Sequence, residues 1–140
     1  MKKLLIVFCT ALSLLFIGGC SMSVIPQEEK NILYWIPEES HFVDYKIVDD
    51  KIIFSYSICF VNDSQDEQSV SLSAKFHKKE TNEWIKNNGF FFGNDKYGEL
   101  LSEKIAPKTK KNIIFYFDGE YLGGVVNTKL SFPYEIALMN

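Results

Sequence analysis

Few side chains of this 140-residue sequence are of the types that catalyse reactions or bind metals, and they are far apart. The chain has three cysteines, Cys9, Cys20 and Cys59, and two histidines, His41 and His77. A nucleophilic cysteine needs a neighbouring base, and a zinc site needs several ligands at short spacing. Neither pattern is present, nor is any phosphate-binding, dinucleotide-binding or serine-hydrolase motif. The sequence therefore predicts no catalytic residue, no metal site and no cofactor.

Oxygen-bearing side chains gather in one polar segment, residues 62–68. Asn62, Asp63, Asp66 and Glu67 carry the kind of oxygen atoms that calcium prefers, but the segment lacks the order and the glycine of an EF-hand. We interpret it as a solvated hairpin loop. The other carboxylates do not single out the facing pair that a glycosidase needs.

The context of Cys20 is more informative. Met1-Lys2-Lys3 is followed by an apolar run from Leu4 to Ile17. Two positive charges before a run of this length are typical of a secretory signal peptide, and a membrane-spanning helix needs a longer run of ~20 residues. Ile17-Gly18-Gly19-Cys20 resembles the lipobox of bacterial lipoproteins, in which small residues precede a cysteine that receives lipid and becomes the new N-terminus.

This resemblance implies three parts. Residues 1–19 are the lipoprotein signal peptide, residues 20–31 are the lipidated Cys20 with a flexible tether, and residues 32–140 are the folded domain. Lipid on Cys20 would anchor the protein to the extracytoplasmic face of the bacterial membrane, because the two or three acyl chains of such a cysteine hold firmly. The alternatives are an ordinary secretory peptide cleaved near Gly19 and a buried N-terminal helix.

The charge of the chain and its cysteine content exclude one class of partner and one kind of crosslink. Without Lys2 and Lys3 the chain keeps 13 lysines against 18 acidic residues, a net charge of −5, and it has no arginine. No stretch is basic enough to follow a phosphate backbone, so we expect no nucleic-acid partner. Cys59 remains as the lone thiol, which excludes an intramolecular disulfide and is interpreted as a small buried apolar side chain.

The pattern from residue 43 onward is mostly of period two, which predicts strands. Phe54, Tyr56, Ile58 and Phe60 alternate with small polar side chains, as expected of a half-buried central strand over 51–61. Strands over 43–48, 51–61 and 70–76 are predicted to form a meander. An almost continuous apolar run over 113–117 predicts a strand buried on both faces.

Three further segments complete the prediction. Residues 81–88 are predicted to form one or two turns of helix or, alternatively, a long hairpin loop. Residues 100–105 are predicted to be a short edge strand. Within residues 130–138 every second residue is apolar, which predicts a strand. Pro133 in this segment predicts that the strand lies at an edge or contains a bulge.

About seven short strands without a strong amphipathic helix predict an all-β fold, an antiparallel β-sandwich. At the level of architecture, residues 42–138 resemble the immunoglobulin-like domains of small bacterial lipoproteins. The paired cysteines around a tryptophan that mark antibody domains are absent. The resemblance rests on pattern and transfers no functional residue.

Aromatic residues next to glycines are the candidate contacts with a partner. The segments 89–98 and 118–124 place Phe91, Tyr97 and Tyr121 between glycines, which would let the backbone present their rings on loops. The alternative is that Trp84 and its neighbours cover the spare ring of the Phe90–Phe92 run in a satellite core.

These observations predict a non-enzymatic binding or interaction module on the outer side of the membrane. Its expected partners are the membrane, through the lipid, and another envelope protein or a glycan. Two alternatives stay open: a small envelope hydrolase or carbohydrate-active enzyme, and an inhibitor or immunity-type lipoprotein that protects the envelope.

Overall fold

The computed structural model describes residues 32–86 and 90–139. The chain divides into two compact units, Met1–Lys30 and Asn31–Asn140, and only the second lies within the described ranges. The signal peptide, Cys20 and the tether predicted over 20–31 therefore lie outside the described residues. Across the described ranges, no helix has both the length and the apolar character needed to cross a membrane.

The described residues are mostly in antiparallel strands, which confirms the all-β prediction. In chain order the elements are β1 (Leu33–Val48), β2 (Lys51–Asn62), β3 (Gln68–Val70), β4 (Leu72–Lys75), α2 (Lys78–Thr81), β5 (Ile85–Lys86), β6 (Phe90–Phe92), β7 (Glu103–Ile105), β8 (Thr109–Tyr121) and β9 (Glu135–Leu138).

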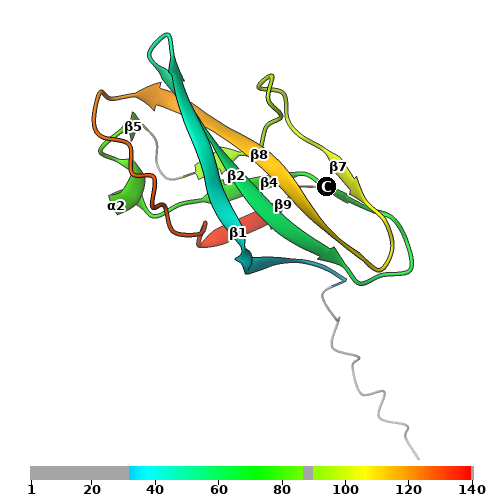
Figure 1. Ribbon diagram of the computed structural model, residues 1–140. Helices are drawn as coiled ribbons and strands as arrows, with labels where there is room; N and C mark the ends of the chain where they lie inside the picture. The colour runs from blue at the N-terminus through cyan, green and yellow to red at the C-terminus, as the bar shows by residue number, and fades with distance from the viewer. Residues whose placement is uncertain (1–31, 87–89, 140) are drawn as a thin grey trace, which may run out of the picture. The chain divides into compact units, whose positions relative to one another are not determined.

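One sheet has the strand order β1-β2-β8-β5 (Figure 1). Its β1–β2 hairpin closes through Asp49 and Asp50, whose φ angles are 49° and 60°. Two consecutive left-handed residues make the type I′ turn that matches the twist of antiparallel strands, and aspartate tolerates that conformation better than most side chains. The turn predicted at Asp49-Asp50 is therefore present.

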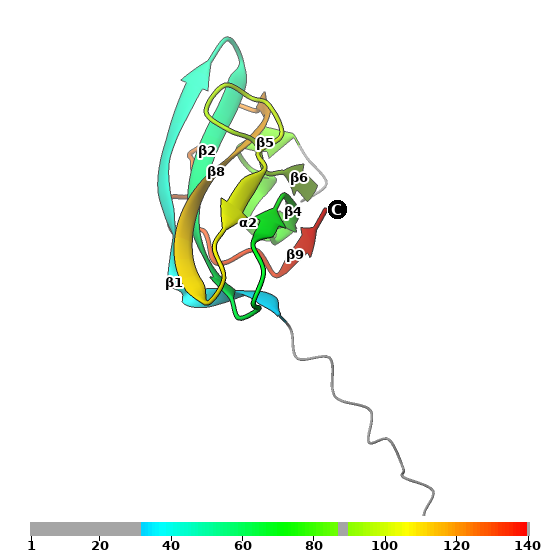
Figure 2. The same ribbon diagram turned by 90° about the vertical axis from the view of Figure 1, so that its right-hand side faces the viewer.

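The remaining strands form a second layer, with orders β6-β4-β9 and β3-β7 (Figure 2). The predicted three-stranded meander is wrong, because the second neighbour of β2 is β8 and the segment 68–75 pairs only with β6, β7 and β9. A strand with one fully apolar face gains more by facing another such strand than by extending the same sheet, since both faces then leave water.

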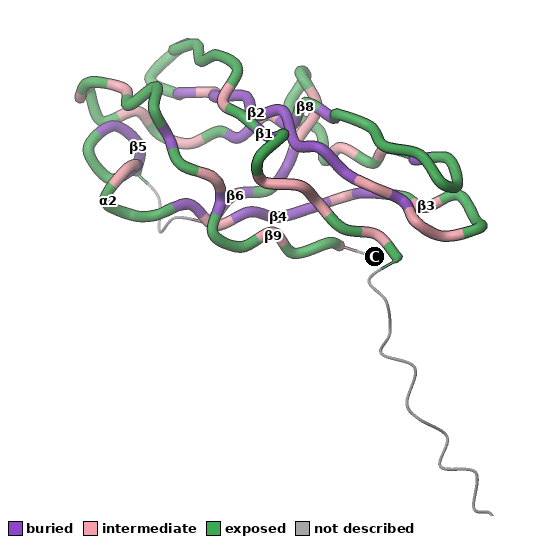
Figure 3. The backbone as a smooth tube through the Cα atoms, turned by 60° about the horizontal axis from the view of Figure 1, so that its bottom comes forward, coloured by how far each residue is buried: buried purple, intermediate pink, exposed green. Residues whose placement is uncertain are grey.

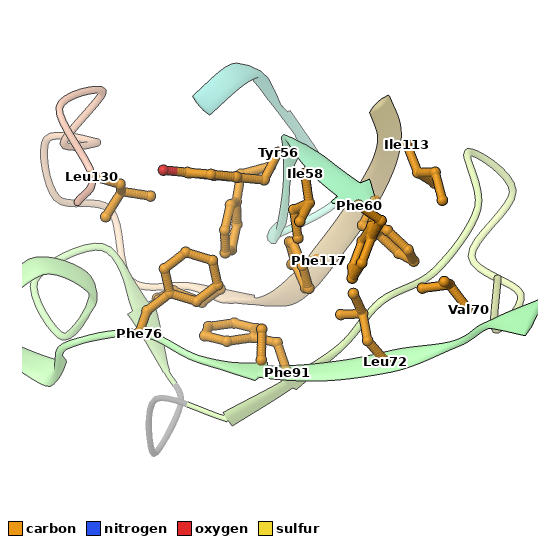
Figure 4. Close-up of a cluster of buried hydrophobic side chains, with 14 of the residues drawn as sticks. Tyr56, Ile58, Phe60, Val70, Leu72, Phe76, Phe91, Ile113, Phe117 and Leu130 are labelled. Carbon is orange, nitrogen blue, oxygen red and sulfur yellow. The ribbon is translucent and has the colours of Figure 1, made fainter. Parts of the chain in front are cut away.

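The two layers enclose one aromatic core. The ring of Phe54 lies 5.4 Å from those of Phe76 and Trp84 and 5.2 Å from that of Phe91, in edge-to-face geometry. Such contacts add about 0.5–1.5 kcal/mol per pair beyond the burial of area. Figure 4 shows side chains of both layers pointing toward one another, and Figure 3 shows buried residues along β2 and β4.

The predicted faces of β2 and β4 are confirmed, with two corrections to burial. Phe54, Ile58 and Leu72 are completely buried, as expected. β2 is not half-buried, because Ser55, Ser57 and Cys59 on its other face are also buried. β8 is not buried on both faces, because Ile114 is 45% exposed between the buried Ile113 and Phe115.

The shorter elements also differ in part from expectation. The helix α2 is a single turn that begins before the predicted segment, and β5 follows it after Trp84. β7 covers the second half of the predicted strand over 100–105 and pairs with β3. Of the edge strand or bulge predicted over 130–138, the edge strand is present in its second part as β9, which pairs only with β4 among the described strands.

Candidate functional site

A groove crosses the outer face of the four-stranded sheet. It consists of two adjoining hollows of about 470 and 400 Å³ that share lining residues. We call it the outer groove and define it by its lining: Val43–Lys46 of β1; Lys51, Ile53 and Ser55 of β2; Tyr116 and Asp118 of β8; and the loop 94–98.

Strand register sets the floor of the outer groove. Ser55 lies opposite Tyr116, and Ile53 lies opposite Asp118. On the other side, the same two residues of β2 lie opposite Asp44 and Lys46. Residues directly opposite on antiparallel strands project to the same face, so two cross-strand rows form, Asp44–Ser55–Tyr116 and Lys46–Ile53–Asp118.

A bulge in β1 makes these rows possible. The pairing shifts by one residue between Phe42 and Asp44, and Val43 is the extra residue. An inserted residue reverses the faces of all that follow it in the strand. Asp44 and Lys46 therefore share the outer face with Ser55 and Ile53.

The loop 94–98 forms one wall of the groove and is hydrogen-bonded to β8. Asn94 and Tyr116 exchange two backbone hydrogen bonds, each 2.9 Å long. The Asn94 side-chain amide also donates to Oδ1 of Asp118 at 3.1 Å. Asn94 thus pairs with β8 in the manner of a one-residue strand.

Asp95 organises the rest of that loop. Its Oδ1 accepts hydrogen bonds from the backbone N–H groups of Tyr97 and Glu99, at 2.8 and 3.0 Å. Its backbone carbonyl accepts from the N–H of Gly98 at 3.1 Å, and Gly98 has a φ of 90° that favours glycine. The resulting compact turn presents Tyr97, whose side chain is 78% exposed. Lys96 Nζ lies 4.9 Å from the centroid of its ring.

The outer groove contains as many cations as anions. Three lysines, Lys46, Lys51 and Lys96, face three aspartates, Asp44, Asp95 and Asp118. Within the described ranges six other lysines form ion pairs, whereas none of these three does. The ammonium groups of Lys46 and Lys51 are therefore available to donate to a ligand, whereas that of Lys96 lies over the Tyr97 ring.

The three predicted contact residues lie in different environments. Tyr97 lines the outer groove. Phe91 is only 3% exposed and packs in the core, so it offers no surface to a partner, and the solvent-facing ring of that run is Phe92 at 53% exposure. Side chains alternate along β6, so the middle ring of three must face opposite to its neighbours. Tyr121 is half-buried, and its hydroxyl donates to the Gly124 carbonyl at 2.7 Å.

The alternative, in which Trp84 and its neighbours cover the spare ring in a satellite core, is wrong, because the ring that faces away from the core, Phe92, is 53% exposed. Trp84 is completely buried against Phe54, and its indole N–H donates to the Glu80 carbonyl at 2.6 Å. Trp84 and Phe91 belong to the main core rather than to a satellite.

Sequence reasoning missed Tyr116 and Asp118 as groove residues. Tyr116 lies within the run 113–117, for which the pattern predicts a strand buried on both faces, and Asp118 directly follows that run. Asn112, Tyr116 and Asp118 lie on the same face of an alternating strand, and two of them are polar. This alternation in the sequence indicates that one face of β8 is solvated.

Cys59 is confirmed as a buried thiol with no exposed surface. Its Sγ lies 3.7 Å from Oε2 of Glu39, which in turn forms an ion pair of 2.7 Å with Lys110. Burial, together with the Glu39 charge, raises the pKa of the Cys59 thiol, and the hydrogen bond from Lys110 lowers the pKa of the Glu39 carboxyl. The thiol is held in its protonated, unreactive form.

The histidines and the loop over 62–68 do not form a metal site. His77 precedes α2 with its ring 4.9 Å from that of Tyr134, while His41 pairs with Ser57 in the sheet. Among the described residues no three side chains of His, Cys, Asp or Glu are placed to hold a metal ion. Asn62 is buried and donates to main-chain carbonyls, so it acts as a structural latch.

The outer groove thus combines the rings of Tyr97 and Tyr116 with hydrogen-bond donors and acceptors. Oδ1 of Asp95 and Oδ1 of Asp118 accept hydrogen bonds within the protein. Comparison of the chain with family models, with curated proteins and with solved structures found no match.

Proposed function

We propose that this protein is a lipid-anchored binding module of the bacterial cell envelope, and that its outer groove contacts the partner. The observation that carries the proposal is Tyr97, an aromatic side chain that is 78% exposed at the end of a turn fixed by Asp95. An exposed ring on an organised loop binds with a small loss of conformational entropy. Tyr116 offers a second ring at the floor of the same groove.

The anchor part of the proposal is supported by the sequence alone. Lys2 and Lys3, the apolar run and the small residues before Cys20 occur in the order of a lipoprotein signal. The domain begins at Ile32, next to the N-terminal end of β1, whereas the outer groove involves Val43–Lys46 near the other end of that strand (Figure 1).

An immunoglobulin-like topology is part of this proposal and is supported by the strand pairings. In that fold the sheets contain neighbours A-B-E and C-F, and the variable type adds C′ beside C. β1-β2-β8 matches A-B-E, and β6-β4-β9 matches C′-C-F. Domains of this architecture carry binding surfaces on a rigid scaffold, as we propose here.

The binding role is tested by co-sedimentation of the purified full-length protein, kept in detergent, with an insoluble cell-envelope fraction from which the membrane lipids have been extracted, so that the lipid on Cys20 cannot itself cause sedimentation. We expect Tyr97→Ala and Tyr116→Ala to reduce the bound fraction. Tyr134→Ala is the matched control, because Tyr134 is 55% exposed and does not line the groove. Equal binding by all four proteins would refute the role of the groove.

The same mixture separates binding from catalysis. If soluble fragments accumulate with time and Asp118→Asn prevents their release, the protein is an envelope hydrolase instead. The anchor is tested by metabolic labelling with a palmitate analogue. Cys20→Ala should stay unprocessed and unlabelled, and equal labelling of both forms would exclude lipid on Cys20.

A further inference from the structure

We propose that the outer groove is a subsite for a neutral glycan, an uncharged chain of hydroxyl-rich rings. This inference rests on the proposed binding function and specifies its ligand. Three properties of the groove, its charge balance, its paired backbone and its tyrosines, lead to this class and away from charged polymers and peptides.

The charge balance is the first property. With three lysines and three aspartates, the lining of the outer groove has no net charge that would select a polyanion or a polycation. A polyanion would meet Asp44 and Asp118, and a polycation would meet Lys46 and Lys51. Sugar hydroxyls both donate and accept hydrogen bonds, so they can use the ammonium and the carboxylate groups at once.

The backbone of the floor is the second property. At the floor of the groove, residues 51–55 of β2 are paired on one side with β1 and on the other with β8. Their N–H and C=O groups are committed, so an extended peptide cannot add to the sheet here as an extra strand. On this face of β2, Ile53 lies between Ser55 and Lys51, so no continuous apolar row is available along that strand for the side chains of an extended peptide.

The tyrosines are the third property. The faces of pyranose rings carry C–H groups that pack on aromatic rings, while their edges carry hydroxyl groups. Tyr97 and Tyr116 belong to the lining of both hollows, with polar side chains around them. Lys96 and Asp95 restrain Tyr97 before a ligand arrives. The tyrosine rings suit the C–H faces of a sugar, and the polar side chains beside them suit its hydroxyl groups.

The size of the groove suits a short stretch of such a chain. Its hollows, of about 470 and 400 Å³, are open and contiguous, as binding sites for extended ligands are. The groove crosses β1, β2 and β8, so a linear glycan could lie across the strands with successive rings in the two hollows.

The test uses the purified full-length protein and a panel of soluble probes. The panel contains neutral β-linked oligosaccharides of glucose and of N-acetylglucosamine, sulfated oligosaccharides, and short polyglutamate and polylysine peptides. We expect saturable binding of at least one neutral oligosaccharide, measured by calorimetry. We expect Tyr97→Ala to weaken it about tenfold or more, Tyr97→Phe to retain most of it, and Tyr134→Ala to leave it unchanged.

Salt dependence gives an independent readout. Binding of a neutral glycan should vary little between low and high salt, whereas binding of a charged polymer should fall steeply. The inference is overturned if no neutral oligosaccharide binds, or if only charged probes bind and salt abolishes the binding. If those results accompany Tyr97-dependent binding to the envelope fraction, the binding function stands and only the ligand class is wrong.

Discussion

The side chain of Asn62 should hold one end of the sandwich together. It is completely buried, and its amide donates to the carbonyls of Asp66, Ile105 and Ala106 at 2.8, 2.9 and 3.2 Å. Its Oδ1 accepts from the N–H and the hydroxyl of Ser64 at 3.0 and 2.7 Å. One residue of β2 thereby fixes both the loop that follows it and the end of β7.

The cost of Asn62→Ala can be worked from these contacts. The carbonyl of Ile105 is buried, and leaving it without a donor costs about 1–3 kcal/mol. The contacts to Asp66 and Ser64 are partly buried and can be replaced by water, which leaves a net loss of about 0.5 kcal/mol each. We expect Asn62→Ala to destabilise the domain by about 2–4 kcal/mol and to lower Tm by roughly 10–25 °C.

Urea unfolding followed by tryptophan fluorescence measures this change. Asn112→Ala is the control, since the Asn112 amide donates one long hydrogen bond of 3.4 Å, to the Ser57 hydroxyl, and its loss should change Tm by a few degrees at most. Asn62→Asp should be at least as damaging at neutral pH, because a carboxylate would face carbonyl oxygens. If Asn62→Ala and Asn112→Ala unfold at the same urea concentration, the latch does not contribute as reasoned.

Three other predictions address the core and its titratable groups. Phe115→Ala should destabilise by ~3–5 kcal/mol in urea unfolding, and Ser73→Ala on the opposite face by much less; similar losses would refute the assignment of faces. Burial and the nearby Glu80 charge raise the pKa of Tyr56 to about 12. The folded state therefore keeps the phenol proton longer than the unfolded state, and up to about 2–3 kcal/mol of stability should be lost as pH rises from about 10 to 12; a Tyr56→Phe variant should lack this part of the decline. Cys59 should react with iodoacetamide only as fast as the domain unfolds, and rapid labelling of the native protein would contradict its burial.

The sequence pattern predicted those features of the fold that depend on residues close together in the chain. The faces of β2 and β4, the turn at Asp49-Asp50 and the edge position of β9 all follow from alternation, turn residues and proline. Each of these features depends on a few neighbours in the chain. Alternation along the chain does not determine which layer a strand joins. The predicted meander is therefore wrong, because the strand after β2 belongs to the second layer.

The first half of β1 was missed because its pattern is interrupted. Pro37 and the acidic residues after it break the alternation, and the structure absorbs them as an irregularity between Ile36 and His41. There Ser40 donates to the Ile36 carbonyl at 2.7 Å and accepts from the Cys59 N–H at 3.0 Å. A side chain thus takes the place of a backbone partner, which a period-two pattern cannot reveal.

The candidate site was predicted only at Tyr97. Its glycine and aspartate neighbours indicated a loop, and the loop is present. Tyr116 and Lys46 join Tyr97 only through the register of β1, β2 and β8. Register depends on the Val43 bulge and on pairing between distant segments, so these two residues could not be assigned to the site beforehand.

The pairing of β2 with β8 also determines how the domain can fold. It joins Lys51 to Glu120 and Asn62 to Thr109, with the entire stretch 63–108 between the two strands. The loop-closure entropy of that stretch must be overcome before any of these contacts forms, which is the situation of slowly folding all-β domains. During synthesis the central pair cannot be complete until residue 120 has left the ribosome. A chain truncated before β8 should therefore remain without a stable sheet, and the domain should fold as one unit after its release.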